Sequence, residues 1–482
     1  MRAIGNTLPR RFKAKASGSI TAGKPLIVKS DGDVTQISAT GGGPASGSAF
    51  EASYVLDYSG PAAAYDSSND RVVVFGGDSS GRFVAYVGTV SGEAITFGSA
   101  QTAGDDPLVE DVCATFDPDN NKVILAYRDR SNSNYGTCRV GTVSGSTISF
   151  GTATVFLSAA GSDKQITYDT NANKVVIASR NNSDSGNGHG FVGTVSGTNI
   201  SFGSGTAFNS TGTTDNIGMC FDNSNNKVVI AYQDNSASHG IAVVGTVSGT
   251  SISFGTPVTF ASAGTAEISC VFDTTNNKVV IFYRDSANNS YGTAIVGTVS
   301  GTSISFGSEV VFESSDISLG NNKQPSVFDP DNSLACVSYN ISGTGGCFKA
   351  GTVSGTSISF GDRLNFESGD SYRIGAVYST TSDRVINNFI DNNRSNYFTS
   401  VVIQTSSTNL TSENYIGIAE YAAADTETAT VLIKGGVSTT QSSLTPGQTY
   451  FVQTDGTIAT SAGTPSVTAG TAVTSTKLIV KG

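Results

Sequence analysis

The stretch VGTVSGTSISFG, Val296 to Gly307, decides the fold because it recurs almost unchanged along the chain. The glycine that begins GTVSG stands at Gly88, Gly141, Gly193, Gly245, Gly297 and Gly351, so successive copies lie 52 to 54 residues apart. Its Ser-Gly pair is typical of a tight hairpin turn, and TSISFG alternates with the period of two of a half-buried strand. The stretch therefore predicts a β-hairpin that is repeated at a fixed interval.

A second motif keeps the same period and consists of an aromatic residue, an aspartate, a polar turn and an apolar run. Its copies read AYDSSNDRVVVF, TFDPDNNKVILAY, TYDTNANKVVIAS, CFDNSNNKVVIAY, VFDTTNNKVVIFY and VFDPDNSLACVSY, and a degenerate seventh, VYSTTSDRVINNF, begins at Val377. The apolar run indicates a strand that is buried on both faces. The recurring aspartates are Asp66, Asp117, Asp169, Asp222, Asp273 and Asp329. They either cap their own turns or ligate calcium, and the incomplete spacing of a calcium loop favours capping.

Four strand signals per unit of about 52 residues are typical of a β-propeller blade. Seven copies fill residues 49–409, so we expect a seven-bladed β-propeller. A solenoid is the alternative, but it would not need a strand borrowed from the other end of the chain. The segment FEASYVLD, residues 50–57, precedes the first repeat, and the last repeat lacks a full outer strand. We therefore expect this segment to complete the last blade and close the ring.

The two ends of the chain carry a different repeat. SITAGKPLIVKSDG, Ser19 to Gly32, matches SLTPGQTYFVQTDG, Ser443 to Gly456, without a gap. One module runs from Ser443 to Gly482, while its sister begins at Ser19 and resumes at Tyr415. The sequence thus predicts an all-β protein whose propeller is inserted in a small two-module β-domain formed by residues 1–48 and 410–482. Such an insertion is tolerated when the ends of the inserted domain lie together.

Composition excludes several classes of function. Charged residues make up 14% of the chain and the net charge is −11, against roughly 25% charged residues in average domains. No long basic run occurs, so no nucleic-acid partner is expected. No apolar run approaches the roughly 18 residues of a membrane span, and the basic N-terminal segment lacks the apolar core of a secretory signal. Six cysteines without a CxxC pair and two histidines indicate free thiols from a reducing compartment, with no metal or cofactor.

The candidate binding residues lie in the loops that follow the buried strands. An aspartate ends five of these strands, and in four of those copies an aromatic residue or histidine follows within the loop. Carboxylates can accept hydrogen bonds from sugar hydroxyls while an aromatic ring packs on the apolar face of a sugar, whereas the alternative is that these aspartates only cap their loops. The candidates are Asp129, Tyr135, Asp234, His239, Asp285, Tyr291, Asp391 and Tyr397.

No enzyme is expected from these motifs. No glutamate recurs with the repeat, no GxSxG, HExxH or Walker sequence occurs, and the absence of Trp excludes the boxes of sialidase propellers.

The pattern of the two chain ends resembles that of small β-domains of tailed-bacteriophage virion proteins. The segments that carry the resemblance are ITAG, DG, IGIAEYA, LTPGQTYFVQTDG, AGTAV and LIVKG. Such domains belong to head-decoration and tail-fibre-like proteins, and VGTVSGTSISFG is similar to repeats of fibre-like proteins of marine phages. The resemblance implies a structural protein of the virion, assembled in the bacterial cytoplasm and anchored to capsid or tail proteins by its small domain. It also implies a homo-oligomer, since fibres and decoration proteins are commonly trimers. A glycan-binding adhesin that recognises the host is the alternative function, and a polysaccharide depolymerase is the third.

Overall fold

The computed structural model describes residues 10–29, 32–37, 44–55, 60–103, 107–236, 238–320, 324–405, 410, 413–453, 456–463 and 466–481. The chain divides into two compact units. The terminal unit comprises Met1–Gly43 and Ser406–Gly482, and the ring unit comprises Pro44–Thr405. The predicted ring began at residue 49, whereas strand β4 (Ala45–Ser46) already belongs to the ring unit. The other predicted boundary, at residue 409, lies outside the described residues.

The ring unit is built of antiparallel meanders, one for each sequence repeat. The first strands are β6 (Ala62–Asp66), β10 (Val109–Asp117), β14 (Thr154–Asp169), β19 (Thr214–Asp222), β24 (Thr265–Asp273), β29 (Ser326–Asp329) and β34 (Ser371–Ser379). The second strands are β7 (Arg71–Gly77), β11 (Lys122–Asp129), β15 (Lys174–Asn181), β20 (Lys227–Asp234), β25 (Lys278–Asp285), β30 (Leu334–Ile341) and β35 (Arg384–Asp391). The third strands are β8 (Phe83–Ser91), β12 (Tyr135–Ser144), β16 (Asn187–Ser196), β21 (His239–Ser248), β26 (Tyr291–Ser300), β31 (Gly345–Ser354) and β36 (Tyr397–Gln404).

The predicted hairpin forms the outer part of each sheet. Short strands pair with the end of the third strand across the Ser-Gly turn: β9 (Ala94–Phe97), β13 (Thr147–Phe150), β17 (Asn199–Phe202), β22 (Ser251–Phe254), β27 (Ser303–Phe306) and β32 (Ser357–Phe360). Further outer strands pair with the start of the third strand: β18 (Thr206–Asn209), β23 (Val258–Ala261), β28 (Val310–Ser318) and β33 (Leu364–Asn365). The alternation of TSISFG places Ile304 in the core, where it is 3% exposed. The second strands are buried almost throughout, as the apolar runs predicted.

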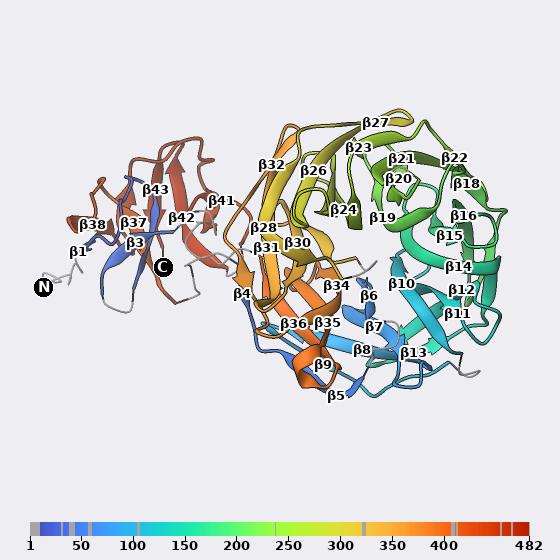
Figure 1. Cartoon of the computed structure of the whole chain (residues 1–482). Helices are drawn as coiled ribbons and strands as arrows, with labels where there is room; N and C mark the ends of the chain where they lie inside the picture. Colours follow the sequence, from blue (N-terminus) through green and yellow to red (C-terminus); the bar gives the residue numbers. More distant parts are fainter. Residues whose placement is uncertain are drawn as a thin grey trace, which may run out of the picture. The chain divides into compact units, whose positions relative to one another are not determined.

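The first strands contact one another in a closed cycle. Strand β6 contacts β10, and the contacts continue through β14, β19, β24 and β29 to β34, which contacts β6 again. The sheets therefore surround a common axis, as Figure 1 shows. The predicted all-β propeller fold is confirmed, and the solenoid alternative is wrong because a solenoid has no contact between its first and last repeats.

The ring closes with a strand from the start of the chain. Strand β5 (Phe50–Val55) pairs with β36, and β4 pairs with the end of the same strand. The ring of Phe50 lies 5.0 Å from that of Phe97 in the first blade and 6.4 Å from that of Phe398 in the last, between ring centroids. The segment 50–57 thus completes the last blade as predicted, although Leu56 and Asp57 lie outside the described residues.

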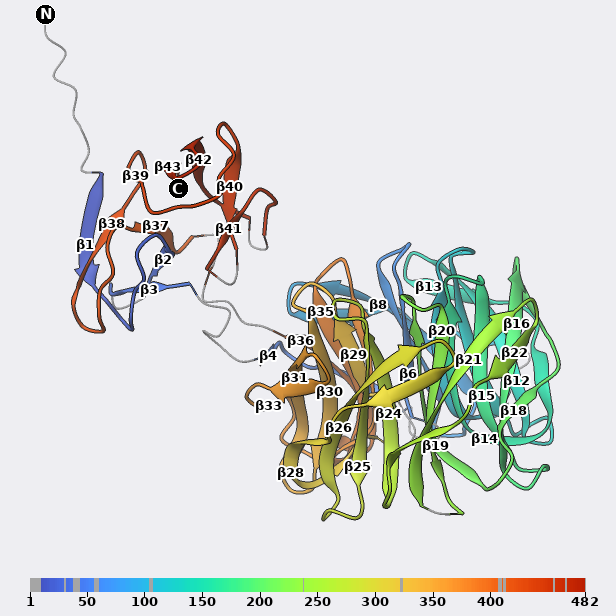
Figure 2. The ribbon, with the colours of Figure 1, turned by 90° about the horizontal axis from the view of Figure 1, so that it is seen from above.

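The terminal unit contains two five-stranded sheets of the same topology. One has the order β1 (Arg11–Lys15), β38 (Thr428–Leu432), β37 (Tyr415–Ala419), β2 (Pro25–Val28) and β3 (Val34–Gln36), and Figure 2 shows these strands. The other has the order β39 (Val437–Ser438), β43 (Lys477–Val480), β42 (Val467–Thr474), β40 (Thr449–Val452) and β41 (Ile458–Ala459). Each strand of one sheet corresponds to a strand of the other, so the two repeats seen in the sequence are two copies of one module. The first copy is assembled from both ends of the chain.

Candidate functional site

The loops between second and third strands hold the predicted site residues. In four blades the aspartate that ends the second strand is the direct cross-strand partner of the aromatic residue or histidine that begins the third. The pairs are Asp129 with Tyr135, Asp234 with His239, Asp285 with Tyr291, and Asp391 with Tyr397. The structure therefore brings each predicted pair together within its own blade.

The four carboxylates accept hydrogen bonds from their own loops. Asp129 accepts from the backbone N–H of Ser131 at 2.9 Å, and Asp285 accepts from that of Ala287 at 3.0 Å. Asp391 accepts from the N–H of Asn393 and so caps η1 (Asn392–Arg394), the short 3-10 turn of the last blade. These bonds give the aspartates a loop-capping role, while their contact with a sugar stays a prediction.

The four aromatic partners lie half-buried at the beginning of their strands. Partial exposure is common to all four of them, namely Tyr135, His239, Tyr291 and Tyr397. Each one can therefore present part of its ring to solvent.

Backbone hydrogen bonds join these loops from blade to blade. The N–H of Thr214 donates to the carbonyl of Gly186 in the preceding blade at 2.9 Å, and that of Val109 donates to Gly81 at 2.9 Å. The N–H of Ile317 donates to Ser290 at 3.1 Å. The loops at this edge of the ring thus hold one another in place, which suits a binding surface that spans neighbouring blades.

A polar cavity of about 390 Å³ lies where two of these blades meet. Its lining comes from the loop before β16 and the first residue of that strand, the loop between β18 and β19, and the loop after β20. The lining residues are Ser185, Asn187, Ser210, Thr211, Gly212, Thr213, Asn235 and Ser236. All of them are uncharged, and seven carry a hydroxyl or amide that can both donate and accept hydrogen bonds.

Buried polar residues hold the lining of this cavity in position. The amide of Asn209, which is 4% exposed, donates to the carbonyl of Gly212 at 3.0 Å and accepts from the N–H of Thr211 at 3.2 Å. Asp234 accepts from the hydroxyl of Ser236 at 2.6 Å. The predicted residue Asp234 therefore acts behind the cavity wall by fixing Ser236.

An ionic cluster supports the same wall from the first and second strands. Asp215 bonds both the guanidinium of Arg180 and the side-chain amide of Asn235, which lines the cavity. Oδ2 of Asp163 lies 3.8 Å from Nη1 of Arg180. Burial, together with the nearby charges of Asp111 and Asp215, raises the pKa of Asp163 to about 6. The charges are thus paired behind the cavity, and its surface is neutral.

Sequence reasoning missed this cavity because most of its residues lie outside the predicted aspartate–aromatic pairs. The loop Ser210–Thr213 connects an outer strand to the next blade, and the sequence NSTGTT occurs there in one blade alone. This departure from the repeat was the available signal.

The aspartates at the opposite edge of the ring cap their turns, as favoured from the sequence. Asp117, for example, accepts from the N–H groups of Asp119 and Asn120, both at 3.0 Å.

Among the described residues, Asp329, Asp331 and Asp383 have carboxylate oxygens within 4.8 Å of one another, the spacing of a metal site. Tyr378 donates to both Asp331 and Asp383, at 2.7 and 2.6 Å. The single hydroxyl proton of Tyr378 is thus shared between two of the three carboxylates.

Two cavities lie along the axis between the first strands, with volumes of about 330 and 420 Å³. Each first strand contributes one aromatic residue to their lining: Tyr65, Phe116, Tyr168, Phe221, Phe272, Phe328 and Tyr378.

No helix in the described part of the chain has the length and apolar character needed to cross a membrane.

Comparisons with known proteins found no matching family model and no matching curated protein. Solved structures with a similar arrangement of strands include the SapL1 lectin in complex with α-methyl fucoside, at 13% identity and a TM-score of 0.39, covering 64% of this chain and 98% of that one. A mutant of the Aleuria aurantia lectin in complex with Fucα1-6GlcNAc is 14% identical, with a TM-score of 0.41 and coverage of 65% and 97%. A chain of the mitotic checkpoint complex is 9% identical, with a TM-score of 0.47 and coverage of 75% and 94%. Likenesses this distant carry no information about ligands.

Proposed function

We propose that this protein binds glycans without catalysing a reaction, and that the polar cavity between the blades of β15–β16 and β20–β21 is a binding site. The cavity carries this proposal. Its volume of about 390 Å³ lies within the usual range of about 300–1,000 Å³ for small-molecule sites. A sugar ring presents hydroxyl groups on several sides, and the lining offers hydroxyls and amides from three loops.

The neutrality of the lining favours a neutral sugar over an anionic ligand. Arg180, the nearest cation of the cluster, is bonded to Asp215 and lies near Asp163. A phosphate or carboxylate in the cavity would gain no free positive charge there and would lie close to two carboxylates. A neutral sugar meets no such repulsion.

Preorganisation supports binding because ordering loose polar side chains on binding reduces affinity. Ser236 is held by Asp234, Asn235 by Asp215, and the loop Ser210–Thr213 by Asn209. Most of the hydrogen-bonding groups therefore stand in place before a ligand arrives.

The neighbouring blade provides a matched variant to test the site. The loop Asp234-Asn235-Ser236 corresponds to Asp285-Ser286-Ala287 in the next blade, so the double change Asn235→Ser with Ser236→Ala copies a loop that the fold already accommodates. On a panel of immobilised neutral oligosaccharides, we expect the unchanged protein to bind at least one glycan. Titration calorimetry with that glycan should show at least about tenfold weaker binding by the double variant, which loses the Ser236 hydroxyl and replaces the Asn235 amide by a shorter hydroxyl.

The control is Ser286→Ala in the neighbouring blade, which should leave the affinity unchanged. Equal affinity of the double variant and the unchanged protein would contradict the site, and an absence of binding across the panel would contradict the function.

We further propose that the protein is part of a phage virion and that its terminal unit is the attachment module. The resemblance of the terminal repeats to phage domains supports this role. The distribution of exposed apolar side chains also supports this attachment role. Of the eight large apolar side chains that are exposed among the described residues, five belong to the terminal unit: Phe12, Tyr421, Val437, Val473 and Ile479. Phe12 and Val437 lie on β1 and β39, which are corresponding edge strands of the two modules.

Exposed apolar residues on sheet edges suit contact with another protein or with further copies of the chain. The virion proposal predicts that the protein is found in purified phage particles at a fixed copy number. Its absence from such particles would contradict the proposal, whatever the outcome of the glycan experiment.

A further inference from the structure

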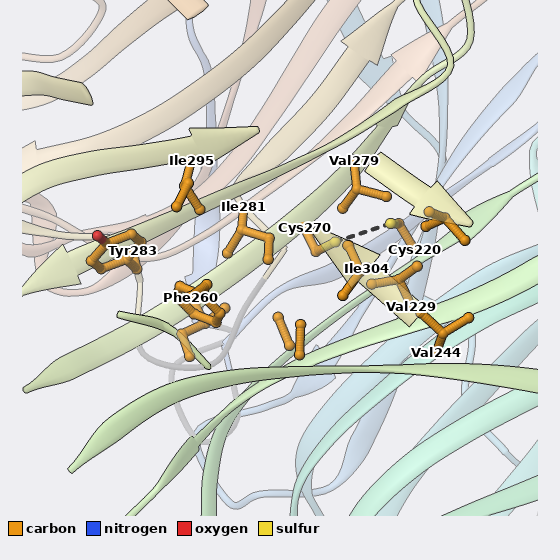
Figure 3. Packing of buried hydrophobic residues seen from close by; sticks show 14 of the residues in the cluster. Cys220, Val229, Val244, Phe260, Cys270, Val279, Ile281, Tyr283, Ile295 and Ile304 are labelled. Atoms are coloured by element: carbon orange, nitrogen blue, oxygen red, sulfur yellow. Dashed lines mark hydrogen bonds between the residues drawn. The ribbon is translucent and has the colours of Figure 1, made fainter. Parts of the chain in front are cut away.

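Two cysteines from neighbouring blades face each other in the core. Cys220 lies on β19 and Cys270 on β24, and their Sγ atoms are 2.9 Å apart (Figure 3). Cys220 stands two residues before the aspartate that ends its strand, whereas Cys270 stands three residues before its own. Because side chains alternate between the faces of a sheet, this offset of one residue turns the two thiols toward each other across the interface between the blades.

The surroundings of the pair are apolar and close to the axis. Val229, Ile281 and Ile304 belong to the same buried cluster, and Figure 3 shows them around the two sulfur atoms. Both cysteines also line the axial cavity of about 420 Å³. Cys220 is 7% exposed and Cys270 is 1% exposed, so a small molecule in the cavity reaches Cys220 first.

We propose that Cys220 and Cys270 are an oxidation site at which a peroxide converts two free thiols into a disulfide between neighbouring blades. A disulfide bond is about 2.0 Å long, so the sulfur atoms need to approach by less than about 1 Å. Small shifts of the two side chains within their cluster are sufficient for this approach.

The reaction balances with one molecule of hydrogen peroxide. The Cys220 thiolate attacks one peroxide oxygen, the O–O bond breaks, and the leaving hydroxide takes a proton to become water. The resulting sulfenic acid of Cys220 is attacked by the sulfur of Cys270, the S–S bond forms, and the second oxygen leaves as water. Two thiols are oxidised by two electrons and the peroxide is reduced to two water molecules.

Burial controls how readily the pair reacts. Loss of hydration, together with the neighbouring Cys270, raises the pKa of the Cys220 thiol well above its ordinary value. The reactive thiolate is therefore scarce at neutral pH and more abundant in alkaline solution. Cross-linking should accordingly be faster at pH 9 than at pH 7.

Mass spectrometry of the full chain tests this site. After treatment with hydrogen peroxide at pH 9 and blocking of the remaining thiols, we expect the loss of two of the six thiols and one cross-linked peptide pair that contains Cys220 and Cys270. A chain that keeps six thiols, a sulfenic or sulfinic acid on Cys220 without a cross-link, or a cross-link of another pair would each overturn the proposal.

Two variants distinguish a specific cross-link between Cys220 and Cys270 from non-specific oxidation of cysteines. Cys220→Val copies Val271, the residue that stands two positions before the aspartate in the neighbouring blade, and should fold but form no cross-link. Cys336→Ser changes a buried cysteine whose thiol donates to the carbonyl of Leu334, and should leave the cross-link intact.

Thermal unfolding provides a second measurement on the same samples. Oxidation should raise the Tm of the unchanged protein by a few degrees, because the disulfide closes a long segment of the unfolded chain. The rise should be absent in Cys220→Val, and a rise of equal size in that variant would contradict the assignment.

Discussion

Gly297, Gly301 and Gly307 belong to one copy of the repeated hairpin but are required for different reasons. A Cβ at Gly297 would lie 2.7 Å from Cδ1 of Ile304, so this glycine makes room for the apolar residue of the partner strand. Gly301 has a φ of +62°, which the hairpin turn demands and which other residues adopt at a cost. A Cβ at Gly307 would overlap the carbonyl oxygen of Thr356 in the next blade. The sequence predicted the turn glycine, because turn chemistry is local, but the other two depend on contacts that only the fold creates.

The contact at Gly307 recurs around the ring. Gly151, Gly203 and Gly255 meet the carbonyls of Thr198, Thr250 and Thr302 in the same way, and Gly47 meets Glu93 where the last blade adjoins the first. We expect Gly307→Ala to destabilise the protein by on the order of 2 kcal/mol or more, because backbone atoms of two blades must move apart. Chemical denaturation measures this change.

Gly361 is the matched control for Gly307. It ends the same motif in the following copy, but a Cβ there would meet a single atom, the carbonyl oxygen of Ala350, at 3.8 Å. Gly361→Ala should therefore be nearly neutral. Similar losses of stability in both variants would contradict a specific role for the contact between blades.

At the scale of the element, five of the first strands share a β-bulge that the repeat does not reveal. The pairing register shifts between Glu110 and Cys113 in β10, and at corresponding places in β14, β19, β24 and β34. A residue with positive φ stands at each shift: Asp111, Asp163, Asn216, Glu267 and Arg373. These residue types differ from blade to blade, so no motif marked the position. The bulges turn polar side chains toward the interface between blades and place Asp163 and Asp111 beside Lys164, whose side chain is fully buried.

The bulge residue Asp163 should make stability depend on pH. Its pKa in the folded state, about 6, lies above the ordinary value of 3.8 because of burial and the charges of Asp111 and Asp215, which outweigh Arg180 and Lys164. The folded state thus binds this proton more tightly than the unfolded chain. The stabilisation is complete below about pH 4 and is lost as the pH rises through about 6.

Asp163→Asn removes this titration and measures its size. Relative to the unchanged protein, the variant should gain on the order of 2–3 kcal/mol of stability between pH 4 and pH 7. Urea denaturation of both proteins at the two pH values gives the comparison, and a difference that does not change with pH would show that the carboxyl group titrates normally.

At the scale of the whole molecule, the sequence was most informative about what repeats. The period of the hairpin, the buried runs and the closing strand were enough to predict the propeller, since each reflects local pattern or chain order. The aspartate–aromatic pairs were also predicted, because a hairpin fixes their register. The cavity at Ser236 and the pair Cys220–Cys270 were not, since each joins residues of different blades about fifty positions apart whose approach depends on how the sheets pack.

The ring unit should fold without the rest of the chain, because its core and its closing strand lie within Pro44–Thr405. A chain of residues 44–405 is expected to show strand-rich circular dichroism and a cooperative thermal transition. The comparison is a chain of residues 56–405, which lacks β4 and β5 and should unfold at a distinctly lower temperature. Equal transitions in the two chains would show that the N-terminal strand is dispensable for closure.

The pairing of Ala45 with Gln404 places the entry and the exit of the ring side by side. A domain with adjacent ends can be inserted into a single turn of another domain. The fold of the parent domain then does not depend on which domain is inserted. Any other domain with adjacent ends could take the same place in a related chain. Under the proposed function, glycan binding by the ring and attachment by the terminal unit would then be free to diversify at independent rates.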